Sequence, residues 1–251
     1  MQQRTEGIVL KTFPFGEADL IVTYLTLDHG IRKAFAKSPR KIKSRFGSSL
    51  EPLTQARITF MGREDAALPR LTQSDIIRPH QGLRERYECY VRASGMAELI
   101  LTFLPEGVEA HEVYAFFLAM LGRMEADCSV LNALIFRIRL LDMKGYGPAL
   151  TGCVRCSAMT NRFYPSQGAL LCNLCASKLR GMPSVDGAPL GDALELTPGM
   201  LRLYDSLRTW PMERIGRLKA GARMVEELAL LLDAHLKRIL HYPLRTAQFG
   251  K

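Results

Sequence analysis

The sequence lacks the features that would mark a membrane or secreted protein. None of its apolar runs approaches the roughly 20 residues that cross a bilayer as a helix. Its polar start, Met1-Gln-Gln-Arg-Thr-Glu6, does not resemble a signal peptide. We therefore expect no contact with a membrane and a location in the reducing cytoplasm, where disulfides are disfavoured.

Motifs of the common enzyme classes are missing as well. The chain contains no H-E-x-x-H, G-x-S-x-G, G-x-x-x-x-G-K-[ST] or G-x-G-x-x-G. A zinc nucleobase deaminase would require an upstream H-x-E and a proline before its C-x-x-C, but Gly152 precedes Cys153 and no H-x-E occurs. We therefore expect a protein that binds a partner rather than one that catalyses a reaction.

Cysteine is scarce, with six residues, but four of them form two C-x2-C pairs. The pairs are Cys153-Val-Arg-Cys156 and Cys172-Asn-Leu-Cys175, and fifteen residues separate them. This spacing is typical of a zinc ribbon, in which four thiolates surround one Zn²⁺ as a tetrahedron. Because sulfur would fill every coordination position, the ion would be structural rather than catalytic.

Two other states are open to these cysteines, namely free buried thiols or two disulfides. The segment between the pairs suits a ribbon, because a turn at Pro165 to Gly168 separates two short strand-like stretches. We predict one structural zinc ion per chain, held within a segment at about residues 150–178. Cys89 and Cys128 lie in apolar helical patterns and are predicted to be buried, unpaired thiols.

Positive charge is in excess and is concentrated near the start of the chain. The sequence has 34 Lys and Arg against 25 Asp and Glu, a formal net charge of +9, which favours an anionic polymer or an acidic partner. Seven basic residues and no acidic one fall within fourteen positions. This basic run comprises Arg32, Lys33, Lys37, Arg40, Lys41, Lys43 and Arg45. Such a run is often only a solvated loop, so its setting decides the interpretation.

That setting is a row of short β-strands. Period-two patterns bounded by turn residues predict strands over residues 7–13, 20–26, 31–36, 53–61 and 71–76. Five such strands are typical of an OB-type barrel, which binds single-stranded nucleic acid on its strand faces and loops. Most aromatic side chains of a small barrel are core, and Phe15 and Phe46 are the better candidates for stacking on bases.

After residue 80 the periodicity changes to about 3.6. Helices are predicted over residues 83–104, 113–124, 130–144, 197–207 and 218–240. We therefore expect an α+β protein of two domains, an OB-type barrel at residues 1–80 and a helical domain at residues 81–251 that carries the zinc ribbon. His235 and His241 are expected to be packed or exposed residues rather than ligands.

Several stretches occur together in a specific order. They are Gly7-Ile-Val-Leu10, Phe15-Gly-Glu-Ala-Asp19, Ser44-Arg-Phe46, Leu50-Glu-Pro-Leu53, Phe136-Arg-Ile-Arg-Leu-Leu-Asp-Met-Lys-Gly-Tyr-Gly-Pro148 leading to Cys153, and His241-Tyr-Pro-Leu-Arg-Thr246. None is an active-site motif. Over nearly its whole length, the chain resembles the bacterial DNA repair and recombination protein RecO family.

The resemblance implies a recombination mediator that is not an enzyme. Members of the family bind single- and double-stranded DNA, anneal complementary strands and help to load RecA onto DNA coated by the single-strand binding protein. The implied partners are RecR, the acidic tail of the single-strand binding protein and, functionally, RecA and RecF, in a cytoplasm where the protein associates with the nucleoid. Candidates for contact with the tail are Arg214, Arg217, Lys219 and Arg223.

The residues alone also fit a different class of protein. A zinc-ribbon RNA-binding or transcription accessory factor would have the same barrel, charge and metal. Comparing the binding of DNA and RNA of equal sequence would distinguish the two classes.

Overall fold

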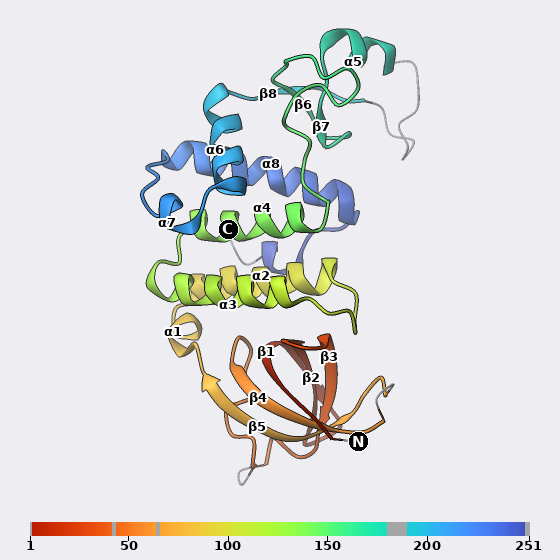
Figure 1. Cartoon of the computed structure of the whole chain (residues 1–251), viewed down its shortest axis with the longest axis vertical. Helices are drawn as coiled ribbons and strands as arrows, with labels where there is room; N and C mark the ends of the chain where they lie inside the picture. Colours follow the sequence, from red (N-terminus) through yellow and green to blue (C-terminus); the bar gives the residue numbers. More distant parts are fainter. Residues whose placement is uncertain (1, 42–43, 64–65, 180–189, 249–251) are drawn as a thin grey trace. The chain divides into compact units, whose positions relative to one another are not determined.

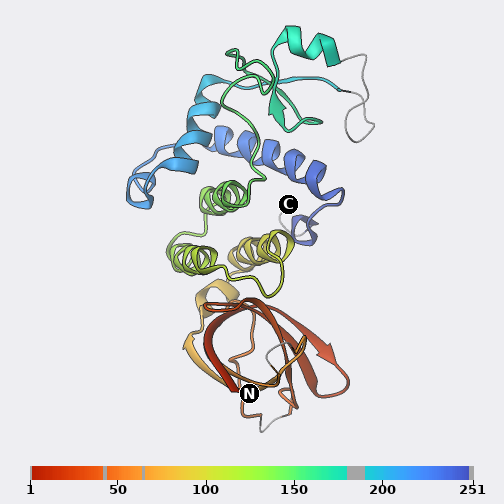
Figure 2. The same ribbon diagram turned by 45° about the vertical axis from the view of Figure 1, so that its right-hand side comes forward.

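Five β-strands form the first part of the chain, as the sequence predicts. In the computed structural model, which describes residues 2–41, 44–63, 66–179 and 190–248, they are β1 (Gln2–Phe15), β2 (Asp19–Thr26), β3 (Gly30–Ala36), β4 (Gln55–Met61) and β5 (Arg70–Arg78). Their order is β1-β2-β3-β5-β4, and the sheet closes into a barrel, whose strands curve round as a ring in Figure 2. The contact between β3 and β5 is parallel and covers two residue pairs, Phe35 with Arg70 and Ala36 with Leu71.

Alternating side chains fill the inside of the barrel. The buried cluster comprises Val9, Val22, Tyr24, Ala34, Ala36, Phe46, Leu50, Ala56, Ile58, Phe60 and Leu71. The register of β1 shifts between Val9 and Lys11, and such a bulge bends a strand. The bend lets β1 pair with β4 along its first half and with β2 along its second half. Full burial of each large apolar side chain here contributes on the order of 1.5–3 kcal/mol.

Helices follow the barrel directly. They are α1 (Gln81–Arg84), α2 (Tyr87–Phe103) and α3 (His111–Ala126), and α2 and α3 lie side by side in Figures 1 and 2. The chain divides into two compact units, of which unit 1 holds residues 1–136 and 244–251 and unit 2 holds residues 137–243. The barrel, α2 and α3 therefore belong to one compact unit.

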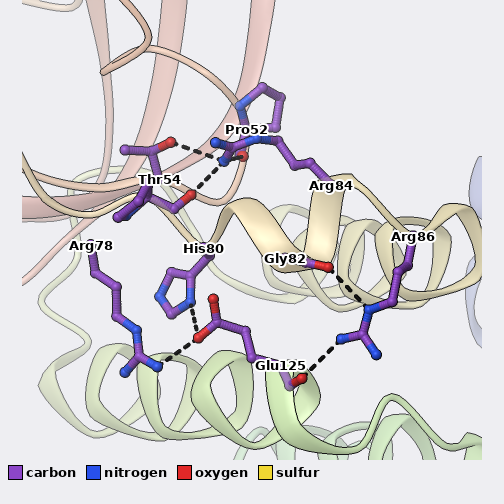
Figure 3. A network of polar contacts seen from close by, with 9 residues as sticks. Pro52, Thr54, Arg78, His80, Gly82, Arg84, Arg86 and Glu125 are labelled. Carbon is purple, nitrogen blue, oxygen red and sulfur yellow. Dashed lines mark hydrogen bonds and ion pairs between the residues drawn. The ribbon is translucent and has the colours of Figure 1, made fainter.

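A polar network joins the barrel to the helices within unit 1 (Figure 3). Glu125, near the end of α3, accepts a hydrogen bond from Arg78 Nη2 at 2.6 Å, and its Oε2 lies 3.1 Å from His80 Nδ1. Arg84 donates to the carbonyl oxygen of Pro52, before β4, at 3.1 Å. Burial lowers the pKa of His80 although Glu125 favours its charged form. The network thus fixes the end of β5 against α1 and α3.

One carboxylate of α2 anchors the last described residues of the chain in unit 1. Glu98 on α2 accepts hydrogen bonds from the backbone N–H groups of Arg245 and Thr246 at 2.7 and 3.0 Å, and from the Thr246 hydroxyl at 2.7 Å. These residues begin the 3-10 helix η1 (Arg245–Gln248). This carboxylate therefore holds the described end of the chain on α2.

Unit 2 contains most of the remaining helices and a small sheet. Its elements are the end of α4 (Val130–Met143), β6 (Arg162–Tyr164), β7 (Ala169–Leu170), α5 (Asn173–Leu179), β8 (Leu194–Glu195), α6 (Pro198–Thr209), α7 (Met212–Ile215) and α8 (Ala222–Leu240). Thr197 caps α6 by accepting from the Met200 N–H. His235 is buried on α8 with Nε2 2.7 Å from the Tyr146 carbonyl oxygen, so it is a packed residue. No helix in the described part of the chain is both long enough and apolar enough to cross a membrane.

The prediction that Cys89 and Cys128 are unpaired thiols is wrong, because the structure joins them in a disulfide with Cα atoms 5.3 Å apart. Cys89 lies in the first turn of α2, and Cys128 lies just after the end of α3. In two adjacent antiparallel helices, the start of the first lies next to the end of the second. Each cysteine fits an apolar helical pattern by itself, and only the folding of the helix pair brings the two together.

Candidate metal centre and nucleic-acid interface

Four cysteines meet beside the small sheet in unit 2. The Sγ atoms of Cys153, Cys156, Cys172 and Cys175 all lie within 4.8 Å of one another, and those of Cys156 and Cys172 are 3.6 Å apart. A tetrahedron with metal–sulfur bonds of about 2.3 Å places its sulfur atoms about 3.8 Å apart. The donor set and its spacing therefore fit one metal ion. We call these four residues the cysteine cluster.

The predicted hairpin holds the two C-x2-C pairs together. β6 and β7 pair in antiparallel register, and the Leu171 N–H and Arg162 carbonyl continue that contact at 3.0 Å. The sequence did not indicate β8, which pairs with the other edge of β6, or α5, which begins at Asn173 within the second pair. These elements are too short to show a clear periodicity.

The local environment favours a thiolate at one member of the cysteine cluster. Burial opposes ionisation of Cys153, but backbone hydrogen bonds at Cys172, Arg155 and Cys156 outweigh it and lower the pKa of Cys153 to about 6. Side-chain hydrogen bonds to Cys156 and Cys172 raise the pKa of Cys175 to about 12. Four crowded sulfur atoms thus share protons, and a bound cation would replace those protons and stabilise all four thiolates.

Part of the predicted basic run comes together at one place on the barrel. Lys37, Lys41 and Arg45 line a hollow of about 360 Å³. The other lining residues are Ser38, Ser44 and Arg70. We call this set of six residues the basic hollow. The loop that carries it leaves the end of β3 and is held against the β1–β2 turn, where the Ser38 N–H donates to Asp19 Oδ1 at 2.6 Å.

The other members of the basic run lie outside the basic hollow. Arg40 is exposed in the same loop. Arg32 and Lys33 are on β3, where Lys33 Nζ forms an ion pair with Glu106 Oε1 at 2.5 Å. Lys43 lies outside the described residues. The ion pair reduces the positive potential that Lys33 adds to the surface. Lys33 is therefore a weaker candidate for phosphate binding than the residues of the basic hollow.

The two aromatic residues predicted to stack on bases, Phe15 and Phe46, differ in their exposure to solvent. Phe46 is only 3% exposed and belongs to the barrel core, so its prediction as a base-stacking residue is wrong. Its position after Arg45 suggested a loop residue, but the loop turns its ring inward. Phe15 is 51% exposed and Phe13 is 59% exposed. The Phe15 ring contacts the Phe35 ring edge to face, with centroids 5.9 Å apart.

Sequence reasoning missed Arg70 as a member of the charged site. Arg70 is 25 positions beyond Arg45 in the sequence, and it reaches the basic hollow because β5 pairs with β3 at Phe35. A parallel contact between strands that are far apart in the sequence leaves no local pattern. Topology alone places Arg70 beside the loop.

Comparison with known proteins covers nearly the whole chain. The family profile described as "Recombination protein O N terminal" matches residues 1–80, and the profile described as "Recombination protein O C terminal" matches residues 84–247. The DNA repair protein RecO of Thermodesulfovibrio yellowstonii is 37% identical over 244 residues, which cover 96% of this chain and 95% of that protein.

Two further DNA repair proteins RecO are similar to this chain. The DNA repair protein RecO of Rubrobacter xylanophilus is 31% identical over 247 residues, 96% of this chain and 92% of that protein. That of Streptomyces griseus is 35% identical over 203 residues, 76% of this chain and 81% of that protein. With both family profiles matched and relatives of this similarity, the chain belongs to the RecO family of DNA repair proteins.

Proposed function

We propose that this RecO-family protein binds single- and double-stranded DNA on the cationic side of its barrel and anneals complementary strands. Family membership assigns the chain to DNA repair and recombination. The observation that carries the finer proposal is the basic hollow, whose loop is held at the turn after β1, the strand that bears the exposed rings of Phe13 and Phe15. Cations that contact phosphates release counterions, and exposed rings stack on bases of any sequence.

The barrel is proposed to be of the OB type and to act as the DNA-binding domain of residues 1–80, followed by a helical domain of residues 81–251. Two features support this assignment, the closed five-stranded topology and the short contact between β3 and β5. OB-type barrels bind extended strands through their faces and loops. Binding of this kind screens the repulsion between two strands and leaves base edges free to pair.

The metal is proposed to be Zn²⁺, one ion per chain, with a structural role. Four sulfur donors favour zinc and leave no position for water or substrate. Cys153, Cys156, Cys172 and Cys175 would hold the ion and brace the small sheet. The protein is accordingly proposed to act without a catalytic step of its own.

Partners follow from the same proposal. We expect the chain to act with RecR and the single-strand DNA-binding protein and to assist the loading of RecA in the pathway that includes RecF, in the cytoplasm at the nucleoid. For the acidic tail of the single-strand binding protein, the candidates are exposed arginine and lysine residues of unit 2. Of these, Arg214 lies over the Trp210 ring at 3.9 Å and Arg223 pairs with Glu227 at 2.9 Å, while Arg217 and Lys219 are exposed between them.

Strand annealing tests this function. Complementary DNA oligonucleotides coated with single-strand binding protein are mixed with and without the chain, and duplex formation is followed by energy transfer between end labels. We expect the chain to accelerate pairing, and a matched pair of RNA strands to respond less. Absence of acceleration would contradict the mediator function, whereas a preference for RNA would favour an RNA-binding or transcription accessory factor.

A further inference from the structure

The basic hollow has a lining suited to one kind of ligand. It is formed by four cationic side chains and two hydroxyl groups, around a volume of about 360 Å³. None of the described lining residues is acidic or apolar, whereas pockets for neutral small molecules are predominantly apolar. The lining therefore selects an anion that carries several hydrogen-bond acceptors, as a phosphate group does.

Arg45 of the basic hollow is held in place before any ligand arrives, and strand pairing fixes the backbone of Arg70. Arg45 Nη2 donates to the Leu71 carbonyl oxygen at 3.3 Å, and its guanidinium lies 4.8 Å from the centre of the Phe46 ring. Arg70 stands on β5 at the point where β5 pairs with Phe35 of β3. Side chains that are already ordered lose less conformational entropy on binding. The planar fork of a guanidinium also matches two phosphate oxygens at once.

Short-range backbone hydrogen bonds join described residues of the loop that precedes Arg45. The Lys41 N–H donates to the Ser38 carbonyl oxygen at 3.3 Å, and the Ser44 N–H donates to the Lys41 carbonyl oxygen at 2.9 Å. Within the described part of the chain, neither Lys37, Lys41, Arg45 nor Arg70 has a carboxylate within ion-pair distance. Their charge is therefore available to a ligand.

We propose that the basic hollow is a seat for a single phosphate group of the nucleic-acid backbone, in which Arg70 is a principal ligand. The inference rests on the proposed DNA-binding function and adds to it a residue outside the basic run and a fixed point for the strand. Phe35, the pairing partner of Arg70, contacts the exposed Phe15 ring. A phosphate in this seat thus places neighbouring bases within reach of an aromatic surface.

The test compares Arg70→Gln with Arg57→Gln. Arg57 is a matched control, because it is an exposed arginine on the neighbouring strand β4, pairs with Glu6 at 3.6 Å and lies outside the basic hollow. The binding of a fluorescent oligothymidylate to each protein is measured by anisotropy over a series of chloride concentrations. Loss of one phosphate contact on a single strand reduces the slope of log affinity against log salt by about 0.7. We expect this change for Arg70→Gln and none for Arg57→Gln.

A second experiment distinguishes binding of a backbone phosphate from binding of free inorganic phosphate. Inorganic phosphate replaces chloride at constant ionic strength, and we expect it to displace the oligonucleotide from the wild type more effectively than from Arg70→Gln. A wild-type salt slope in Arg70→Gln would overturn the phosphate seat while leaving DNA binding by the barrel intact. Binding of inorganic phosphate that does not compete with DNA would also overturn it, by assigning the hollow to a free anion. A wild type that binds no DNA would instead contradict the proposed function.

Discussion

Breaking the disulfide between Cys89 and Cys128 is expected to lower the stability of unit 1 substantially. The two residues are 39 positions apart, and the chain-entropy relation for a loop of that length gives about 4 kcal/mol at 25 °C. A change of 1 kcal/mol moves the melting temperature of a chain of this size by roughly 2–4 °C. The expected decrease in the unfolding midpoint of unit 1 is therefore on the order of 10 °C.

The measurement uses thermal unfolding of the oxidised protein with and without a phosphine reductant, together with hydrogen exchange in α2 and α3. The double variant Cys89→Ala, Cys128→Ala is the control, and its midpoint should be low and insensitive to the reductant. Thiol titration of the unfolded, metal-free protein should find four of its six cysteines reactive before reduction. Six reactive thiols, or a wild-type midpoint that the reductant leaves unchanged, would show that the bond between Cys89 and Cys128 does not stabilise unit 1.

Three further predictions concern the metal, a buried histidine and an exposed ring. Metal analysis of the purified protein should find about one zinc ion per chain, and the Cys172→Ser variant should lose this ion. If the wild type contained no zinc, the cysteine cluster would be only a group of packed thiols. Burial lowers the pKa of His235 from 6.5, so the unfolded state binds the proton first and the stability of unit 2 should fall as the pH drops below about 6.5. Urea unfolding on both sides of that pH should show a weaker dependence in His235→Gln, and an equal dependence would exclude His235 as the cause. Phe15→Ala should weaken single-strand binding by about 1–3 kcal/mol without changing the salt slope, because it removes stacking and no charge; an unchanged affinity would exclude the ring from the interface.

Local patterns were sufficient to predict the elements that are long and regular. Alternation located all five strands, although β1 begins at Gln2, earlier than the predicted start at residue 7. The spacing of the four cysteines was sufficient to predict their clustering, because a C-x2-C pair is itself a local structure. In both cases the information lies within a few consecutive residues.

The features that the sequence did not reveal depend on contacts between distant segments. Arg70 reaches the basic hollow only through the pairing of β3 with β5, and Cys89 meets Cys128 only because α2 and α3 lie side by side. Phe46 lies in an irregular loop without periodicity, so no pattern indicated that its ring is buried. Long-range packing, rather than local preference, decided each of these positions.

The most direct test of the proposed DNA interface is the salt dependence of DNA binding in the double charge reversal Lys37→Glu, Lys41→Glu. Both residues are exposed and line the basic hollow, so the substitutions should leave the fold intact, as circular dichroism can verify. The wild type should lose affinity steeply with salt, and the variant should bind weakly with a slope shallower by at least about 0.7, since loss of the one phosphate seated in the basic hollow removes about 0.7. Equal slopes for the two proteins, or no binding by the wild type even at low salt, would contradict the assignment of the DNA interface to this side of the barrel.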